Sequence, residues 1–368
     1  MRNTHNTITR VTCRYMGTRW GYLHVVKKGE RSDEKFIHIY PLCMVSGQPR
    51  IIMIPPKVNY RRIGGLNLAV IATDRVDYIL FRKKPRVVFT YYKRNRDGGA
   101  LHIEWGEPPT ITLEKQVIVK AKETATDVKI KMISFHSDYR QKILKEKANY
   151  DFKRKTDEEG DPWIQIEIDK IPAGEEIKIV HQITIQTKPH TYNGEWNPIP
   201  NGEYLAETKY HQVKHPKIQE TTRKLLGETP RETAYNILKY IYTNIRYKLT
   251  LERQGALKTL EYGFGKCADF ADLYVAMLRA SDIPARVVSG LVIKDIDDIE
   301  LHAWVEINVM KNVWIQSDPT WGAFGGIGAI WVSEAKTKEE KPRVSLNYQN
   351  GDIDVDIRET IVATRNMD

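Results

Sequence analysis

The sequence predicts an α+β protein in which β-rich regions precede a core of helices packed on one side of an antiparallel sheet. Between residues 109 and 189, apolar residues stand at every second position, which is the period of half-buried strands. From 229 to 279 the period is helical, and between 286 and 321 strand-like runs follow. Helices followed by strands within one region are typical of the α+β class.

Length and composition place the chain among ordinary globular proteins. Its 368 residues are enough for two or three domains, and 41% apolar with 28% charged residues is a usual balance. We find no apolar run long enough to cross a bilayer and no secretory signal at the N-terminus, so we expect a cytoplasmic protein without membrane contact. We expect a basic β-rich N-terminal region, an Ig-like β-sandwich, a linker, an α+β core and a C-terminal extension, at 1–108, 109–190, 191–204, 205–335 and 336–368.

The positive charge is concentrated in the N-terminal region. Residues 1–108 contain 20 Lys and Arg against 8 Asp and Glu, residues 109–200 contain 15 of each, and the remainder contains 22 against 24. Basic and aromatic residues are interleaved in FRKKPRVVFTYYKRNRDGG, residues 81–99, which is compatible with binding to a nucleic acid or to an acidic protein surface. A pair of amphipathic strands with their cations in water is the simpler interpretation, because no nucleic-acid fold motif accompanies the charge.

The first half of the chain has the pattern of strands and turns. Before residue 108 the candidate strands are HIYPLCM, RIIMI and RVVFTYY, with a turn at RDGG, and they identify no known fold. In the sandwich region, alternating stretches predict strands at 110–121, 128–135, 163–168 and 176–187. The polar stretch 137–155 is compatible with a short helix or an exposed connection. Residues 188–204, rich in Pro, Gly and Asn, are compatible with a linker or a strap.

Two helices and three strands are expected in the core. Thr229 is a predicted N-cap, with Pro230 at the first helical position and Glu232 completing a capping box. The apolar face of this helix consists of Ala234, Ile237, Leu238, Ile241 and Ile245. A second helix starts at Cys267, and its apolar stripe consists of Phe270, Ala271, Tyr274 and Leu278, before the break at DIPA. Strand-like runs then cover 286–293, 302–309 and 313–321.

A histidine and an aspartate are expected to meet on the last two of these strands. A hairpin that turns at Met310 pairs positions whose numbers sum to 620, which sets His302 opposite Asp318. The aspartate would then hold the imidazole tautomer and stabilise its charged form. A slip of one residue in the register would send the two side chains to different faces of the sheet.

Cys267 has the position of an activated nucleophile. Gly263 and Gly265 allow the chain to turn tightly into the helix that starts at the cysteine. A thiol with an ordinary pKa of about 8.5 becomes a thiolate at a helix N-terminus beside an imidazolium. The following backbone N–H groups can bind an oxyanion. With His302 as base and Asp318 as orienting acid, the order is Cys, His, Asp.

Each of these residues also has a structural interpretation. A single free cysteine is usually a small buried hydrophobe, a single strand histidine usually packs in the core, and Asp318 before Pro319 suits a turn. All three together, in this order, favour the catalytic interpretation. A metal site is disfavoured because only one thiolate is present and no paired ligand spacing occurs, so we expect no metal and no cofactor. The other cysteines, Cys13 and Cys43, can pair with each other and leave Cys267 free.

Three motif blocks resemble one known family. NIRY stands about twenty residues before GKCADFADLYVAMLRASDIPARVVSG, and HAWVEI and WIQSDPTWG follow. Together these blocks closely resemble the transglutaminase-like superfamily, with its papain-like fold, over roughly residues 205–330. The resemblance implies that Cys267 is the nucleophile, His302 the base and Asp318 the orienting acid. The alternating strands before the core resemble the sandwich domain that often precedes it in microbial members.

The resemblance implies acyl transfer. A thiolate attacks a carboxamide or peptide carbonyl of a protein or peptide substrate, ammonia or an amine leaves, and an amine or water resolves the thioester. Animal transglutaminases use a Trp well upstream of the cysteine for the oxyanion, but no Trp stands between Trp196 and Trp304 in this chain. The backbone N–H of Cys267, helped by Tyr247 or Tyr262, is therefore the expected oxyanion donor. Calcium regulation is not implied.

Several other residues have a functional and a structural interpretation. The acidic loop 295–300 contains Asp295, Asp297, Asp298 and Glu300 but lacks a recognised metal-loop spacing, so a solvated loop is favoured over a cation site. Trp304, Trp314 and Trp321 are candidates for the lining of a substrate cleft, with packing of the sheet as the favoured alternative. The glycine-rich stretch 322–328 is expected to be a loop near Asp318, because no helical pattern follows it as a phosphate site would require.

Three functions stay open from the sequence. The first is a cysteine protease or amidase that resolves the thioester with water, which we favour because no amine partner is evident. The second is a transglutaminase that cross-links protein glutamine to amines. The third is a non-catalytic binding module whose basic region 1–108 binds nucleic acid or an acidic partner, with steep salt dependence as its mark. The acyl donor and the oligomeric state are not predicted.

Overall fold

The computed structural model describes most of the chain after residue 109 and the backbone of six strands before it. The described residues are 110–337 apart from 193, 296 and 297, then 343–356 and 362–365, and the strands of the first 106 residues. The predicted strands HIYPLCM and RIIMI lie outside these residues, as do Cys43 and the side chain of Cys13. The fold is sheet-rich with few helices, so the predicted mixture of helices and antiparallel sheets after a β-rich region is confirmed.

The chain divides into two compact units, each built from separated segments. The helical unit contains 1–107, 189–285 and 307–328, and the sandwich unit contains 108–188, 286–306 and 329–368. The changes after Glu107 and Lys188 lie near the predicted boundaries, but the last two sandwich segments come from the expected core and C-terminal extension. The strand Asp298–Met310 (β17) belongs to the sandwich unit up to Glu306 and to the helical unit after it.

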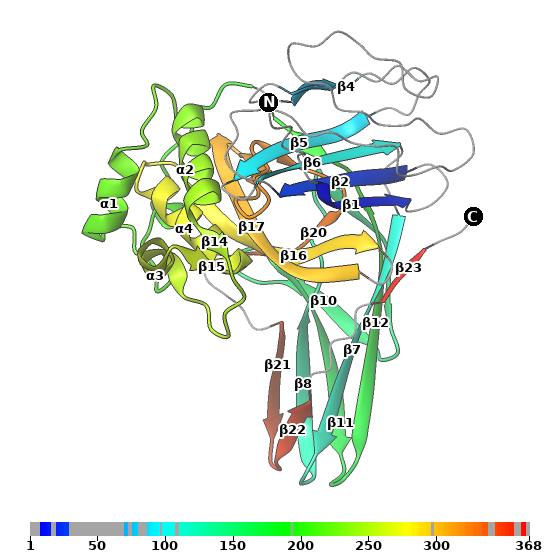
Figure 1. The fold of residues 1–368 in the computed structure, drawn as a ribbon. Helices are drawn as coiled ribbons and strands as arrows, with labels where there is room; N and C mark the ends of the chain where they lie inside the picture. The colour runs from blue at the N-terminus through cyan, green and yellow to red at the C-terminus, as the bar shows by residue number, and fades with distance from the viewer. Residues whose placement is uncertain are drawn as a thin grey trace. The chain divides into compact units, whose positions relative to one another are not determined.

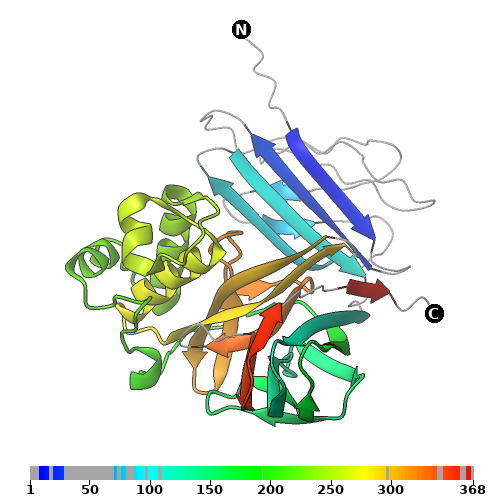
Figure 2. The ribbon, with the colours of Figure 1, turned by 90° about the horizontal axis from the view of Figure 1, so that it is seen from below.

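Within the helical unit, the first 107 residues contribute an antiparallel sheet and a separate hairpin. The sheet has the order β1-β2-β6-β5, and β3 pairs with β4. These strands are Ile8–Tyr15 (β1), Trp20–Lys28 (β2), Val70–Ala72 (β3), Val76–Ile79 (β4), Val87–Asn95 (β5) and Gly98–Gly106 (β6). The sheet is the blue to cyan group in Figure 2. The predicted strand RVVFTYY is confirmed as part of β5, and Asn95 pairs with Gly98 around the predicted RDGG turn.

The helices of this unit gather in one group (Figure 1). They are the short 3₁₀ helix Gly202–Tyr204 (η1), Pro216–Arg223 (α1), Pro230–Asn244 (α2), Gly255–Tyr262 (α3) and Cys267–Arg279 (α4). The predicted N-cap is confirmed, because Thr229 Oγ1 accepts the N–H of Glu232 at 3.1 Å. The capping box is only half formed, since the Glu232 carboxylate accepts the N–H of Glu228 at 2.9 Å. The predicted apolar faces of α2 and α4 are buried.

Short strand pairs complete the helical unit. Parallel β14 and β15 pair with each other, as do β13 and β19, and β18 is the edge of a larger sheet. Their bounds are His190–Thr191 (β13), Arg246–Tyr247 (β14), Phe264–Gly265 (β15), Val313–Ser317 (β18) and Gly326–Ile327 (β19). The segment 188–204 acts as a strap: Trp196 stacks on Phe324 at 5.5 Å, and the Asn197 N–H donates to Val309 O at 2.7 Å.

The sandwich unit contains two antiparallel sheets that face each other across one apolar core. One sheet has the order β10-β11-β8-β21, and the other has β22-β7-β12-β9 with β23 also on β7. These strands are Thr110–Ala121 (β7), Ala125–Ile133 (β8), Gln141–Ala148 (β9), Phe152–Thr156 (β10), Pro162–Ile171 (β11), Glu176–Thr187 (β12), Val344–Gln349 (β21), Ile353–Asp356 (β22) and Val362–Arg365 (β23). The predicted C-terminal extension therefore supplies strands to both sheets.

The expectation of a helix or connection at 137–155 was wrong. The stretch forms β9 and β10, each at the edge of one sheet. As edge strands, β9 and β10 are covered only in part by the rest of the sandwich. Most of their side chains are therefore polar and exposed to water. Their polar composition hides the alternation that marks β7 and β12.

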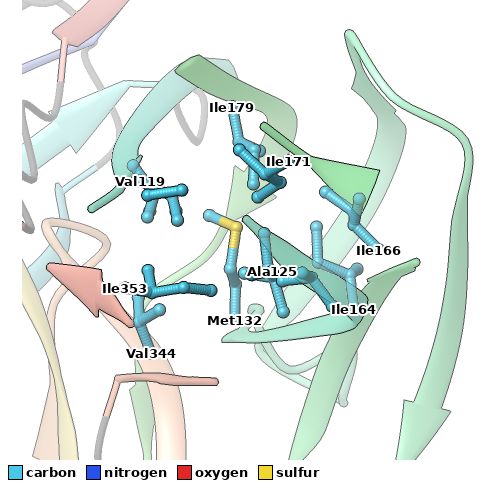
Figure 3. Close-up of a cluster of buried hydrophobic side chains, with 13 residues drawn as sticks. Val119, Ala125, Met132, Ile164, Ile166, Ile171, Ile179, Val344 and Ile353 are labelled. Atoms are coloured by element: carbon cyan, nitrogen blue, oxygen red, sulfur yellow. The ribbon is translucent and has the colours of Figure 1, made fainter. Parts of the chain in front are cut away.

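The core between the two sheets is aliphatic (Figure 3). It consists of Val117, Val119, Ala121, Ala125, Val128, Ile130, Met132, Ile164, Ile166, Ile171, Ile179, Val344 and Ile353. Most of these are β-branched, which suits packing on a pleated surface. The strands β21 and β22 each contribute a side chain to it, so residues of the predicted C-terminal extension belong to this core.

A third sheet, of order β18-β17-β16-β20, carries the predicted histidine. Its other strands are Ala285–Asp295 (β16), Asp298–Met310 (β17) and Trp331–Thr337 (β20). The predicted turn at Met310 was wrong, because β17 runs through Met310 and the turn is formed by Lys311 and Asn312. Asn312 has a φ of 60°, in the left-handed region that asparagine tolerates. A turn at Lys311 and Asn312 does not set His302 opposite Asp318, so the predicted pairing was wrong.

Truncation of the sandwich core should destabilise the protein strongly. The side chain of Ile166 is fully buried between the sheets, so we expect Ile166→Ala to lower the free energy of unfolding by about 2–5 kcal/mol. Urea denaturation followed by tryptophan fluorescence measures the change. Leu144→Ala on β9, where the side chain is about half exposed, is the matched control and should change little. Equal small effects of the two substitutions would contradict the assignment of this core.

Candidate active site

Cys267 is the first residue of α4 and is partly exposed. The helix before it, α3, ends at Gly263 with a φ of 68°, a left-handed conformation that favours glycine. The strand β15 then leads through Gly265 and Lys266 into α4. The sequence prediction of a cysteine at a helix tip after a glycine turn is confirmed. The N–H groups of a first helical turn lack acceptors within the helix and carry positive partial charge, which favours an anion there.

The buried carboxylate of Asp269 holds this helix tip in place. Its oxygens accept the backbone N–H of Lys266 at 2.9 Å, of Gln254 at 2.6 Å and of Gly255 at 3.3 Å. The contact is close enough that a Cβ added to Gly265 would lie 2.6 Å from the Cβ of Asp269. Position 265 therefore requires glycine. Asp269 connects the start of α3 to the start of α4 and thereby fixes the backbone around Cys267.

A second buried carboxylate, Asp272, binds α4 to the rest of the unit. Arg253 donates to it twice, at 2.8 and 2.6 Å, and His211 Nε2 lies 3.0 Å from Oδ1. Burial acts to raise the pKa of Asp272, but the hydrogen bonds from Arg253 and His211 lower it overall. Burial lowers the pKa of His211. The arrangement is that of an ionised aspartate compensated by arginine, which a fully buried charge requires.

Sequence reasoning did not single out Asp269, Asp272, Arg253 or His211. The signal was present in CADFADLYVAML, because two acidic residues stand three apart inside a run that is otherwise apolar. A buried carboxylate needs hydrogen-bond donors, so each of these Asp residues predicts a donor from another part of the chain. Neither donor can be identified by spacing along the chain, because Arg253 and His211 lie on irregular segments before α3 and α1.

His302 lies on the part of β17 that belongs to the sandwich unit. Its side chain is largely buried, and its ring stacks with that of Trp304 at 6.0 Å and 23° between planes. Trp304 is fully buried, and a Cβ added to Gly290 would lie 2.9 Å from its ring. The candidate cleft residue Trp304 is therefore packed inside the sheet and presents no surface to solvent. It supports one side of the His302 ring.

Asp318 follows directly after β18 in the helical unit and is fully buried. Its Oδ1 accepts the N–H of Thr320 at 2.9 Å and of Trp321 at 3.1 Å, so it caps its own turn. Backbone hydrogen bonds in both directions join it to Ala323. The loop 322–328 lies beside it, as expected. These bonds fix the carboxyl group and leave the orienting role of Asp318 a prediction.

The two tyrosines proposed as oxyanion donors lie next to β15, the short strand that leads to Cys267. Tyr247 pairs with Gly265 in the β14–β15 bridge, and its ring lies 6.3 Å from that of Phe270. Tyr262 stacks on Phe264 at 5.8 Å. Both side chains are more than half exposed. Trp321, the other cleft candidate, is partly exposed, as is Trp314, whose ring meets Tyr204 at 4.9 Å. The roles of these residues stay predictions.

A buried ion-pair network lies on the same strand as His302. The Glu306 carboxylate accepts from Lys336 Nζ at 3.0 Å and from Arg286 at 2.7 and 2.9 Å. Lys336 Nζ also donates to Asp138 at 2.8 Å. Burial acts to raise the pKa of Glu306, but the charges of Lys336 and Arg286 outweigh it and lower the pKa to about 2. His302, Trp304 and Glu306 alternate on β17 and so share one face.

The acidic loop lies partly outside the described residues, since the side chains of 294–298 are not described. Within the described part of the chain, no group of three or more His, Cys, Asp or Glu side chains is arranged to hold a metal ion. None of the described helices is both long and apolar enough to cross a bilayer.

One family model and several solved structures resemble this chain. The model of the Transglutaminase-like superfamily matches residues 218–319. A candidate cysteine protease from Cytophaga hutchinsonii shares the fold, with a TM-score of 0.53 and 18% identity over 76% of this chain and 94% of that one. The periplasmic domain of TgpA from Pseudomonas aeruginosa matches 65% of this chain and 82% of its own, at a TM-score of 0.35 and 16% identity. No curated protein matches the chain.

Loss of the Asp269 charge should loosen the helix tip. Asp269→Asn keeps the shape of the side chain but replaces one acceptor oxygen by an amide, so the N–H groups of Lys266 and Gln254 cannot both be satisfied. We expect a loss of about 1–3 kcal/mol of stability and faster hydrogen exchange at these two amides. Asp282→Asn is the control, because Asp282 is exposed and its φ of 59° suits asparagine as well. Unchanged exchange in Asp269→Asn would contradict the holding role.

The Glu306 network should make stability fall in acid. The pKa of the Glu306 carboxyl group is about 2 in the folded protein and about 4.3 in the unfolded chain. The ionised carboxylate therefore contributes fully to the free energy of unfolding above pH 4.3, and this contribution is lost as the pH falls toward 2. Glu306→Gln should lower the urea midpoint at pH 7, and the gap to the parent should narrow between pH 5 and pH 2. Glu176→Gln, at an exposed position, serves as the control. A gap that stays constant with pH would count against the network.

Proposed function

We propose that the protein is a thiol acyl-transfer enzyme, because residues 218–319 match the model of the Transglutaminase-like superfamily. We propose further that it is a hydrolase of the cysteine protease or amidase type. Its substrate is a carboxamide or peptide bond of a protein or peptide. The observation that carries the proposal is the placement of Cys267, partly exposed at the N-terminus of α4 on a backbone held by Asp269.

This placement suits a nucleophile better than a core residue. A core cysteine is normally buried in apolar surroundings, where its thiol is inert. Cys267 is partly exposed, and the helix N-terminus favours both its thiolate and the oxyanion that forms when the thiolate attacks. The buried bonds of Asp269 and Asp272 keep α4 rigid, so the sulfur would need little rearrangement during the reaction.

In the proposed mechanism, Cys267, His302 and Asp318 have the roles of nucleophile, base and orienting acid. The sulfur attacks the carbonyl carbon as its proton passes to the imidazole of His302. The tetrahedral oxyanion collapses, the carbon–nitrogen bond breaks, and the imidazolium gives its proton to the leaving nitrogen. Water, deprotonated by His302, then attacks the thioester, and the acid product and the thiol are released. The backbone N–H of Cys267, with Tyr247 or Tyr262, would bind the oxyanion.

The substrate test uses an unfolded protein that presents many amide bonds at once. Reduced and carboxymethylated α-lactalbumin is incubated with the parent protein, with Cys267→Ala and with His302→Ala, with and without methylamine. Mass spectrometry separates peptide-bond cleavage, deamidation and methylamine incorporation. We expect cleavage or deamidation by the parent and a loss of at least about a thousandfold in each variant, as for other nucleophile and base deletions.

The alternatives give different products. Methylamine incorporation that dominates over hydrolysis would identify a transglutaminase instead. Turnover that survives in Cys267→Ala would contradict the proposed nucleophile. A protein that turns over no bond, and binds nucleic acid or an acidic protein with a steep salt dependence unchanged by Cys267→Ala, would be a binding module of the basic region 1–108.

A further inference from the structure

A segment that begins with the short strand β14, next to Cys267, exposes large apolar side chains. The segment 246–252, RYKLTLE, connects α2 to the start of α3. Tyr247 is 55% exposed, Leu249 77%, and Leu251 is fully exposed. Such side chains contribute almost nothing to folding where they stand, and clustered apolar exposure usually marks an interaction surface. We call these three residues, together with the exposed Tyr262 at the end of α3, the apolar rim.

The rim is fixed to the backbone that carries Cys267. The N–H groups of Arg246 and Lys248 donate to Gly263 O and Gly265 O, each at 2.9 Å. Lys266 Nζ, from the residue before the cysteine, reaches Thr250 O and Leu251 O at 3.4 Å. The exposed side chains are therefore held on ordered backbone along β15 and the tip of α4. An unordered loop would not keep them in this place.

The members of the rim are neighbours on the surface around the helix tip. Tyr247 is paired with Gly265, two residues before Cys267, and its ring contacts Phe270, one turn after Cys267. Lys248 Nζ lies 4.5 Å from the centre of the Phe264 ring, on which Tyr262 stacks. The rim thus extends from both sides of β15 toward the candidate nucleophile.

The charges of the segment are positive and alternate with its apolar residues. Arg246 and Lys248 are exposed between the apolar positions, and Lys266 lies beside them. The exposed acids nearby are Glu252 and, next to Tyr262, Glu261, which is paired with Lys217 at 2.6 Å. An extended polypeptide also alternates its side chains, with a period of two. The chemistry that complements this surface is an extended strand in which large apolar side chains alternate with Asp or Glu.

We propose that the apolar rim binds the substrate polypeptide of the reaction inferred above, as an extended segment rich in Leu, Ile or aromatic residues and in acidic residues. The proposal rests on the proposed function for its placement beside a nucleophile. Leu249 and Leu251 are the specificity-determining residues, and Arg246 and Lys248 add attraction for the acidic side chains. A folded protein surface or a small amide would not span the segment.

Binding is tested in the Cys267→Ala protein, so that no chemistry intervenes. Three fluorescent ten-residue peptides share a central Gln: one alternates Leu and Glu, one replaces Leu by Ser, and one replaces Glu by Lys. Fluorescence anisotropy should show the Leu–Glu peptide binding at least about tenfold more tightly than either of the others. Leu249→Ser with Leu251→Ser should weaken it by a similar factor. Leu226→Ser, at another exposed leucine of the helical unit, should leave binding unchanged.

Three results would overturn the proposal. They are absence of binding of the Leu–Glu peptide below millimolar concentration, equal affinity in the double leucine variant, and a dimer in light scattering that the double variant converts to monomer. In the last case a second copy of the chain covers the rim. Peptide binding without any turnover by the parent would leave the rim standing and refute the proposed function. If the parent turns over the Leu–Glu peptide and the double variant does so with unchanged kcat/KM, the proposed function stands and the role of the rim is refuted.

Discussion

The candidate site depends on one buried interaction, the acceptance of backbone N–H groups by the carboxylate of Asp269. Through it, the residue that caps α4 and the residues that begin α3 share one acceptor. Charge-assisted hydrogen bonds of this kind are stronger than neutral ones, and this one is fully buried. Asp269 approaches Gly265 so closely that no larger residue fits there. Gly265, the N-cap Lys266 and the Asp269 carboxylate together fix the backbone before Cys267. Cys267 is presented at the helix tip as a consequence.

The sheet that carries His302 depends on a second set of buried charges. Glu306 is compensated by Lys336 and Arg286, and a buried carboxylate in this position would be very costly without them. The two ion pairs can form only in one register of β17 against the rest of its sheet. They therefore specify which face of the strand carries Glu306. His302 and Trp304 share that face by alternation. Thus in each unit a buried polar network lies on the element that carries a candidate catalytic residue.

The sequence predicts best those elements that are buried on one face and exposed on the other. The strands β7 and β12 have the predicted bounds, 110–121 and 176–187, because their alternation is regular and their turns are charged. The edge strands β9 and β10 were missed because too few of their side chains are buried to leave a pattern. The turn at Lys311 and Asn312 was misplaced because its signal is a single asparagine in a left-handed conformation and contains no glycine. The partners of Asp272, Arg253 and His211, come from irregular segments, where no periodic pattern predicts a contact.

The central claim is that Cys267 is a nucleophile activated by His302, and its most direct test is the rate of alkylation by iodoacetamide as a function of pH. Peptide mass spectrometry follows Cys267, Cys13 and Cys43 separately in the parent and in His302→Ala. We expect Cys267 alone to react well below pH 8.5, the ordinary pKa of a free thiol, and to lose this reactivity in His302→Ala. If Cys267 is inert, or follows the same pH curve as the other two cysteines in both proteins, the catalytic account is contradicted.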